Sequence, residues 1–288
     1  MKKSIIFNLY KIIVKTFNKT KLRRFVWIDK LNNSLRTKLK PNYIYTKKYN
    51  HKMYLDEIDS LHLSVHQDWE PFETNLIEKL VQKGDIVLDI GANIGFYTLI
   101  LSKLVGKKGK VYAFEADPSN FKLLKKNIEV NNCENVILIN KAVSNKKEDV
   151  NFYIKDSNTG GNSMFKGVGV EELKVKAINL DEYFSDNIKI DFIKMDIEGA
   201  EGRAVIGMKK LLEKNNIKLI TEYFPTQLDG IGEEIGLNSE GYLKLLENVG
   251  FNLYDINENK KRLIKTSPEE IIKKYKGAFT NLYCEKIK

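Results

Sequence analysis

The sequence contains very little cysteine, histidine and proline: two cysteines, three histidines and five prolines among 288 residues. Cys133 and Cys284 are too few for a disulfide framework, and neither lies in a C-x-x-C pair or beside a histidine. Thiol chemistry is therefore not expected, and no metal site is predicted. A reducing compartment, the cytoplasm, is the simplest location for such a chain.

Long apolar runs are also lacking. No segment approaches the roughly eighteen continuous apolar residues of a membrane-spanning helix, and no small-residue cleavage site follows the first apolar stretch, which argues against a secretory signal.

Positive charge is abundant but concentrated at the start of the chain. Residues 1–50 hold fourteen Lys or Arg and one acid, a net charge of +13, whereas the other residues hold 34 bases and 37 acids, a net charge of −3. The basic character therefore belongs to an N-terminal extension.

We place this extension at residues 1–67 and expect a basic amphipathic helix at its start. Apolar residues recur there at helical spacing, and lysines follow another face. The apolar positions are Ile5, Ile6, Leu9, Ile12, Ile13 and Phe17, and the lysines are Lys11, Lys15 and Lys19. Three interpretations are open. In the first, the helix packs on the rest of the chain or on a second subunit. In the second, it lies on the anionic inner face of the membrane. In the third, it binds nucleic acid, although the sequence contains no recognisable nucleic-acid-binding module.

The most informative segment is residues 85–98, which predicts a buried strand, a glycine loop and a helix. The apolar run 86–90, interrupted only by Asp89, fits a central parallel strand. Gly91 and Gly95 allow a sharp turn that brings the backbone close to a ligand. Asn93 stands where the dinucleotide fingerprint G-x-G-x-x-G has its middle glycine, so the loop suits a smaller, positively charged adenosyl cofactor.

A carboxylate follows at the distance expected for ribose binding. Residues 110–115 predict the next strand, which ends in Glu115, 20 residues after Gly95. An acid at this strand end can accept both ribose hydroxyls. Asp117 and Pro118 then supply the N-cap and first residue of a helix. A third strand over 135–140 would bring Ala142 beside the adenine.

These segments resemble class I S-adenosylmethionine-dependent methyltransferases, and specifically the FkbM family. The resemblance rests on Gly84-Asp85, Asp89 to Thr98, Val111 to Glu115, Asn135-Val136 and Ile193-Lys-Met-Asp-Ile-Glu-Gly-Ala-Glu201. It spans roughly residues 68–224, and the family's usual proline after Glu115 is displaced to position 118. It implies a Rossmann-like α/β fold over residues 68–288, with a seven-stranded, mostly parallel sheet whose last strand is antiparallel. It also implies O-methylation of a sugar, polyketide or glycolipid hydroxyl.

Cofactor contacts are expected from the glycine loop, the strand ends and an acid upstream of the first strand. The expected residues are Glu70, Asp89, Gly91, Ala92, Asn93, Gly95, Thr98, Glu115, Ala116, Ala142 and Asp196. For the upstream acid the resemblance falls on Glu70 or Glu73, and the sequence does not separate them.

Catalytic acids are expected after the fourth and fifth strands, predicted over 190–195 and 217–223. Open α/β sheets bind ligands beyond the carboxyl ends of their strands, so Asp196 should lie near the sulfonium. Asp196 is the first candidate base for a hydroxyl acceptor and Glu222 the second. Lys194 can pair with either acid. Glu198 and Glu201 are expected to begin a helix over 200–214, where acids favour the N-terminus.

Other segments complete the predicted fold. A helix is expected over 75–82, and a β-hairpin is inserted at about 150–180, whose loop 156–163 is either a plain connection or a flap over the substrate. A helix over 239–248, a strand over 251–256, a helix over 268–275 and a strand over 279–287 follow. His62 and His66 are spaced like two metal ligands on a helix, but no third ligand is evident, so solvated or packed histidines are favoured.

Alternative functions are weighed against the same residues. The chain lacks the Asn-Pro-Pro-aromatic quartet of nucleic-acid amino-methylases, and neither cysteine is placed as a cytosine methylase nucleophile. A nicotinamide dehydrogenase rests on fold analogy alone. The principal alternative is a non-catalytic or nucleic-acid-associated methyltransferase-like protein that binds through its basic arm. Within the methyltransferase interpretation, the arm favours a membrane-borne acceptor such as a lipid-linked glycan.

Overall fold

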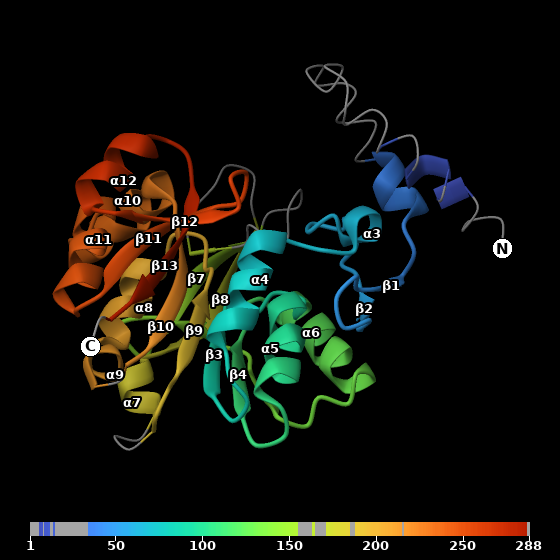
Figure 1. Cartoon of the computed structure of the whole chain (residues 1–288), viewed down its shortest axis with the longest axis horizontal. Helices are drawn as coiled ribbons and strands as arrows, with labels where there is room; N and C mark the ends of the chain where they lie inside the picture. The colour runs from blue at the N-terminus through green and yellow to red at the C-terminus, as the bar shows by residue number, and fades with distance from the viewer. Residues whose placement is uncertain are drawn as a thin grey trace.

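A twisted eight-stranded sheet forms the centre of the protein, which is described by a computed structural model (Figure 1). The structure describes residues 6–7, 9–11, 14, 34–154, 163–164, 171–184, 188–214 and 216–286. The strands of the central sheet are β3 (Ile86–Ile90), β4 (Lys110–Phe114), β5 (Val136–Ile139), β9 (Phe192–Met195), β10 (Lys218–Tyr223), β11 (Asn252–Asn257), β12 (Arg262–Thr266) and β13 (Thr280–Glu285).

The strand order is β12-β11-β13-β10-β9-β3-β4-β5, and the run from β10 to β5 is parallel. The last strand, β13, lies antiparallel between β10 and β11. The Rossmann-like class I methyltransferase sheet expected from the sequence is thus confirmed. An eighth strand, β12, was not predicted; it forms an antiparallel hairpin with β11 at the edge of the sheet. Its residues are mostly half-exposed or exposed, so they carry little of the apolar pattern that indicates a strand.

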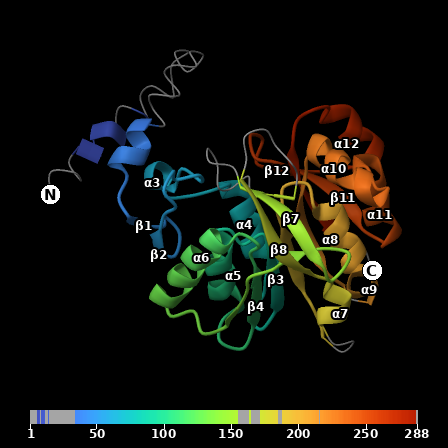
Figure 2. The same cartoon turned by 180° about the vertical axis from the view of Figure 1, so that it is seen from behind.

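Helices cover both faces of this sheet (Figures 1 and 2). One face carries α4 (Pro71–Leu80), α5 (Phe96–Val105) and α6 (Pro118–Val130). The other carries α7 (Leu180–Tyr183), α8 (Glu201–Gly207), α9 (Lys209–Lys214), α11 (Ser239–Asn248) and α12 (Pro268–Lys274). Side chains alternate accordingly: Val87 and Phe192 pack toward α4 and α5, while Leu88 and Ile193 pack toward α8 and α11. Two short helices follow β10: α10 (Pro225–Gly232) and the 3₁₀ helix η3 (Glu233–Ile235).

Two predicted helices have wrong bounds. The helix expected over 75–82 begins at Pro71, because proline is well suited to the first turn of a helix, and Glu70 takes a left-handed backbone conformation just before it. The helix expected over 200–214 is split at Met208 into α8 and α9. Gly207 packs so closely on another segment that a Cβ there would lie 2.0 Å from the Ser144 carbonyl oxygen.

The inserted hairpin is confirmed. Its strands β7 (Asp149–Ile154) and β8 (Glu171–Ile178) pair antiparallel, and β6 (Ala142–Val143) pairs with β8 to complete a small three-stranded sheet. Of the loop 156–163 only Ser163 belongs to the described residues, so its role as a flap stays a prediction.

The described part of the N-terminal extension packs on the rest of the chain. It contains β1 (Tyr43–Tyr45), β2 (Lys52–Tyr54) and α3 (Leu63–His66), and Ile44, Met53 and Leu63 share a core with α5 and α6. His66 ends α3 and His62 precedes it. Within the described residues, neither histidine belongs to a group of three side chains that could hold a metal ion.

The described helical residues at the start of the chain present two different faces. Phe7, Tyr10 and Val14 form a small cluster with Val65, so the helix packs through residues that the sequence did not assign to its apolar face. Ile6 and Leu9 are exposed. The remaining predicted positions of this helix, Ile5, Ile12, Ile13, Lys15, Phe17 and Lys19, lie outside the described residues. None of the described helices is long and apolar enough to cross a bilayer.

Candidate functional site

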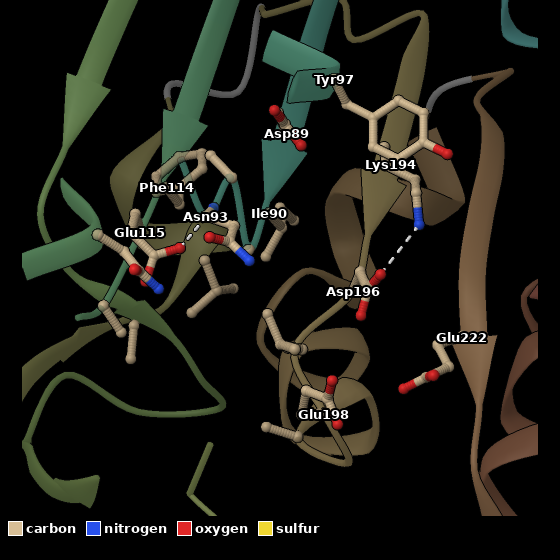
Figure 3. A pocket seen from close by; sticks show the side chains of 18 of the residues that line it. Asp89, Ile90, Asn93, Tyr97, Phe114, Glu115, Lys194, Asp196, Glu198 and Glu222 are labelled. Atoms are coloured by element: carbon tan, nitrogen blue, oxygen red, sulfur yellow. Dashed lines mark hydrogen bonds and ion pairs between the residues drawn. The ribbon is translucent and has the colours of Figure 1, made fainter. Parts of the chain in front are cut away.

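A cavity of about 450 Å³ opens beyond the carboxyl ends of β3, β4, β9 and β10. The residues that follow these four strands meet there because parallel strands end at the same edge of a sheet. Figure 3 shows the cavity with Glu115 on one side and Asp196, Glu198 and Glu222 on the other. Ten predicted residues line the cavity: Glu70, Asp89, Gly91, Ala92, Asn93, Glu115, Ala116, Ala142, Asp196 and Glu222.

The glycine loop packs directly on the loop that follows β9. Gly91 has a φ of 86°, and a Cβ on it would lie 1.9 Å from the backbone carbonyl oxygen of Asp196. The N–H groups of Gly91 and Ala92 both donate to the Phe114 carbonyl, each at 2.9 Å. Because only glycine leaves room for this contact, Gly91 sets the distance between the two sides of the cavity.

Gly95 and Thr98 do not line the cavity but support the wall that does. Gly95 precedes α5 with a φ of 95°, and a Cβ there would meet Leu124 at 2.7 Å. The Thr98 hydroxyl donates to Asp89 Oδ2 at 2.5 Å. Burial raises the pKa of Asp89 to about 6, and the bond from Thr98 opposes that rise.

Glu115 is held by the backbone at the end of β4. Its Oε2 accepts a hydrogen bond from the Asn93 N–H at 2.6 Å, and its Oε1 accepts one from the Asp117 N–H at 2.9 Å. Burial raises the pKa of Glu115 to about 7. A carboxylate oxygen has more than one acceptor position, so both oxygens can still accept hydroxyl donors from a diol.

The residues of this half of the cavity fit an adenosyl cofactor. Asn93 has a left-handed backbone, with a φ of 50°, and its buried Oδ1 has no hydrogen-bond partner. Buried polar groups are usually hydrogen-bonded, so an unpartnered one in a cavity wall indicates a missing polar ligand. Asn140 supports the same region, because its side-chain amide donates to the Glu115 carbonyl at 2.8 Å. An unpartnered oxygen, a glycine turn and a fixed carboxylate together meet the requirements of a ribosyl ligand.

A buried polar network lies behind the cavity, between α4, α5 and β13. Glu70 lines the cavity and accepts hydrogen bonds from the Tyr97 hydroxyl at 2.8 Å and from the Asn281 amide at 3.0 Å. Burial raises the pKa of Glu70 to about 8. Glu73 does not line the cavity and accepts from Asn281 at 2.7 Å. Of the two acids that the sequence could not separate, Glu70 is the one placed to reach a ligand.

Lys194 connects this network to the loop that follows β9. Its Nζ lies 3.3 Å from Glu73 Oε1 and 3.5 Å from Asp196 Oδ2, and the side chain is almost fully buried. Burial alone would lower the pKa of Lys194, but these carboxylates outweigh burial and raise its pKa. The expected pairing of Lys194 with an acid thus falls on Asp196, and on Glu73, which the sequence did not indicate as its partner.

The loop after β9 presents carboxylates in two different roles. Glu201 begins α8, as expected, and its carboxylate accepts from the N–H groups of Ile197 and Gly199, both at 2.9 Å. Glu201 therefore holds the loop in shape. Glu198 does not belong to the helix, contrary to the expectation that it begins it. Its left-handed backbone, with a φ of 53°, places its side chain on the cavity wall.

Aromatic side chains also line the cavity. Phe224 follows β10 and Phe279 precedes β13, and their ring centroids lie 6.0 Å apart. Phe152 and Met164 of the inserted hairpin also line the cavity, as does Trp69. Sequence reasoning missed Tyr97, Asn281, Gln227 and these aromatic residues. Only Phe224 carried a signal, since it directly follows a strand whose end was already assigned to the site.

Comparisons with known proteins agree with this geometry. The profile described as "Methyltransferase FkbM domain" matches residues 89–253, more than half of the chain. A second profile, protein-L-isoaspartate(D-aspartate) O-methyltransferase, matches residues 14–143.

Two curated relatives match parts of the chain. An uncharacterized protein of Methanocaldococcus jannaschii is 29% identical over 153 residues, which cover 52% of this chain and 53% of that protein. A probable cobalt-precorrin-6B C(15)-methyltransferase of Sulfolobus acidocaldarius is 34% identical over 74 residues, which cover 26% of this chain and 38% of that protein. The chain thus spans about half the length, or less, of these relatives.

Solved structures of similar fold include three methyltransferases. A putative rRNA-methylase from Clostridium thermocellum has a TM-score of 0.48 at 16% identity and covers 75% of this chain and 94% of its own. A putative methyltransferase from Streptococcus mutans in complex with SAH has a TM-score of 0.44 at 14% identity, with coverages of 75% and 97%. The methyltransferase FkbM from Methylobacillus flagellatus has a TM-score of 0.43 at 14% identity, with coverages of 79% and 53%.

Proposed function

The chain belongs to the FkbM methyltransferase family and is an S-adenosylmethionine-dependent methyltransferase, and from this premise we propose that it methylates a hydroxyl oxygen of a sugar, glycan or glycolipid. The observation that carries the proposal is the lining of the cavity, to which Asp196 and Glu222 contribute carboxylates and Phe224 and Phe279 contribute aromatic rings. Carboxylates accept hydrogen bonds from hydroxyl groups, and aromatic walls pack against the apolar faces of an acceptor.

S-adenosylmethionine would supply a methyl group on a sulfonium, which transfers by in-line displacement. The residues that line the cavity would hold it. Glu115 would bind the ribose hydroxyls, Gly91 and Asn93 would form the turn that contacts the cofactor, and Glu70 would be available to its amino group. Ala142 belongs to the wall assigned to the adenine.

The hydroxyl acceptor must lose a proton as its oxygen attacks, and Asp196 is the best-placed group to take it. Asp196 is partly exposed at the cavity wall, while Lys194 at 3.5 Å holds its carboxylate from the other side. Burial raises the pKa of Glu222 well above its ordinary value and so favours its protonated form, which cannot take a further proton from the hydroxyl. The enzyme otherwise contributes alignment of the acceptor oxygen, to which displacement reactions are very sensitive.

Two further proposals accompany this function. The arm's exposed Ile6 and Leu9 support contact with a membrane surface where a glycolipid acceptor would lie. The proposed membrane contact would be rejected if the full-length protein failed to pellet with anionic liposomes at low salt.

A nucleic-acid acceptor is disfavoured, because the acidic side chains that line the cavity repel phosphates.

The acceptor class is tested with S-adenosylmethionine carrying a tritiated methyl group. We expect the protein to label sugars or glycolipids with tritium that resists mild alkali, because a methyl ether is stable to base. Tritiated methanol released by mild alkali would instead indicate a carboxyl methyl ester, and label confined to RNA would indicate a nucleic-acid acceptor. Either result would reject the proposed acceptor class but would still support methyltransferase activity.

Cofactor affinity should depend on pH through Glu115. The pKa of Glu115 in the free enzyme is about 7, and only its ionised form accepts hydrogen bonds at both oxygens. We therefore expect Glu115 to contribute about a tenfold rise in the apparent Kd for S-adenosylmethionine between pH 8 and pH 6, in addition to any change due to Glu70. Calorimetry on the wild type and on Glu115→Gln checks this, since the variant retains any titration of the ligand itself. Parallel pH profiles in the two proteins would show that Glu115 does not contact the ribose.

A further inference from the structure

Three carboxylates converge at the acceptor end of the cavity. Asp196, Glu198 and Glu222 each present an oxygen, and these oxygens all lie within 4.8 Å of one another. Figure 3 shows the three side chains around one space, with two of them reaching it from the loop after β9 and Glu222 from β10. Two oxygens on opposite sides of a single cation lie about 4.1 Å apart for Mg²⁺ and about 4.8 Å apart for Ca²⁺. The cluster thus has the dimensions of a divalent cation site.

The cluster brings three carboxylates close to a buried lysine. Lys194 is the buried cation beside the cluster, and it already lies between Glu73 and Asp196. Three carboxylates at such close range repel one another strongly where water is partly excluded. Either protons or a cation must therefore neutralise the cluster.

Unpartnered oxygens provide an independent indication of a ligand. Glu222 is 8% exposed, and its Oε2 has no hydrogen-bond partner among the described residues. Gln227 is 7% exposed, and the same is true of its Oε1. The Gln227 amide nitrogen donates a hydrogen bond to Glu198 Oε2 at 3.0 Å, so Gln227 contacts the cluster through its nitrogen. Carboxylate and amide oxygens are the ligands that hard divalent cations prefer.

We propose that Asp196, Glu198 and Glu222 bind one divalent cation of the Mg²⁺, Mn²⁺ or Ca²⁺ class, while Gln227 contacts the cluster through Glu198. This differs from the sequence analysis, which indicated no metal site. The three ligands are separated by 26 residues in the sequence, and only the pairing of β9 with β10 brings them together.

The role of the cation rests on the proposed function. A divalent cation would bind the acceptor hydroxyl opposite the methyl donor and lower the pKa of that hydroxyl. The proton passes to a carboxylate or to water, the oxygen forms a bond to the methyl carbon, and the carbon–sulfur bond breaks. Two neighbouring hydroxyls of a sugar could both bind the cation, which would fix the position of the one that reacts.

Binding of Mn²⁺ to the full-length protein, followed by electron paramagnetic resonance, tests the site without any acceptor. We expect one Mn²⁺ per chain with a Kd below about 1 mM, and competition by Mg²⁺ or Ca²⁺. Glu222→Gln and Glu198→Gln should each weaken binding at least tenfold. Glu247→Gln, which removes an exposed acid on α11, should bind like the wild type.

Failure of the cation site can be distinguished from failure of the proposed function. If the wild type binds no Mn²⁺ at 1 mM, or if the two cluster variants bind it as well as the wild type, the cation site is rejected. Methylation of glycans that continues in excess chelator would reject the role of the cation in the reaction and would leave the proposed function intact. Tight Mn²⁺ binding that depends on Glu198 and Glu222, in a protein that methylates no glycan, would support the cation site and reject the proposed acceptor class.

Discussion

Replacing Asp196 with alanine is expected to lower kcat about a thousandfold, while the Kd for S-adenosylmethionine changes less than about threefold. The expected loss is large because Asp196 combines two roles at the reacting centre. It is the proposed proton acceptor, and it is the carboxylate that Lys194 holds at 3.5 Å on the cavity wall. Cofactor affinity should persist because the ribose ligand, Glu115, is fixed independently by the backbone N–H groups of Asn93 and Asp117.

The matched comparison is with Glu115→Ala, which should weaken S-adenosylmethionine binding before it affects the chemical step. Single-turnover kinetics at saturating cofactor, with calorimetry for binding, separate the two effects. Glu247→Ala serves as a control for loss of an exposed acid. If Asp196→Ala instead lost affinity and Glu115→Ala lost turnover at saturation, the two roles would have to be exchanged.

Most of the sheet and half of the site were predictable from local sequence. The segment from Ile86 to Thr98 contains a buried strand, two glycines and a helix in immediate succession, so its structure depends little on distant residues. Glu115 was predictable for a related reason. It directly follows a strand with a clear apolar pattern, and acids at that position have a known physical use.

The rest of the site depends on contacts between distant segments, which single-sequence patterns do not contain. Asn281 contacts Glu70 and Glu73 across more than 200 residues, because β13 inserts beside β10. Glu198 was assigned to a helix because acids are common at helix starts, yet its left-handed backbone directs it to the cavity. The same holds for Gln227, whose helix, α10, was not predicted. Residues of this kind acquire their roles only when the sheet is assembled.

The second large effect is expected at Gly91, where alanine should destabilise the protein and weaken cofactor binding. Gly84 provides a matched control, because its φ of 92° is close to the 86° of Gly91, yet nothing lies within 4 Å of a Cβ placed there. Alanine at either position carries the cost of a left-handed backbone, about 1–2 kcal/mol. At Gly91 the new Cβ would also lie 1.9 Å from the Asp196 carbonyl oxygen, so the two loops must separate. Overpacking of this kind typically adds about 1–3 kcal/mol.

Urea unfolding of the two variants isolates the contact from the backbone strain. We expect Gly84→Ala to lose about 1–2 kcal/mol of unfolding free energy and to bind S-adenosylmethionine normally. Gly91→Ala should lose about 2–5 kcal/mol and weaken cofactor binding at least about 30-fold, which corresponds to about 2 kcal/mol. Equal losses in both variants would mean that the loops after β3 and β9 are not in contact in solution. Unequal losses would establish that one glycine sets the spacing between the cofactor loop and the residue proposed to accept the proton.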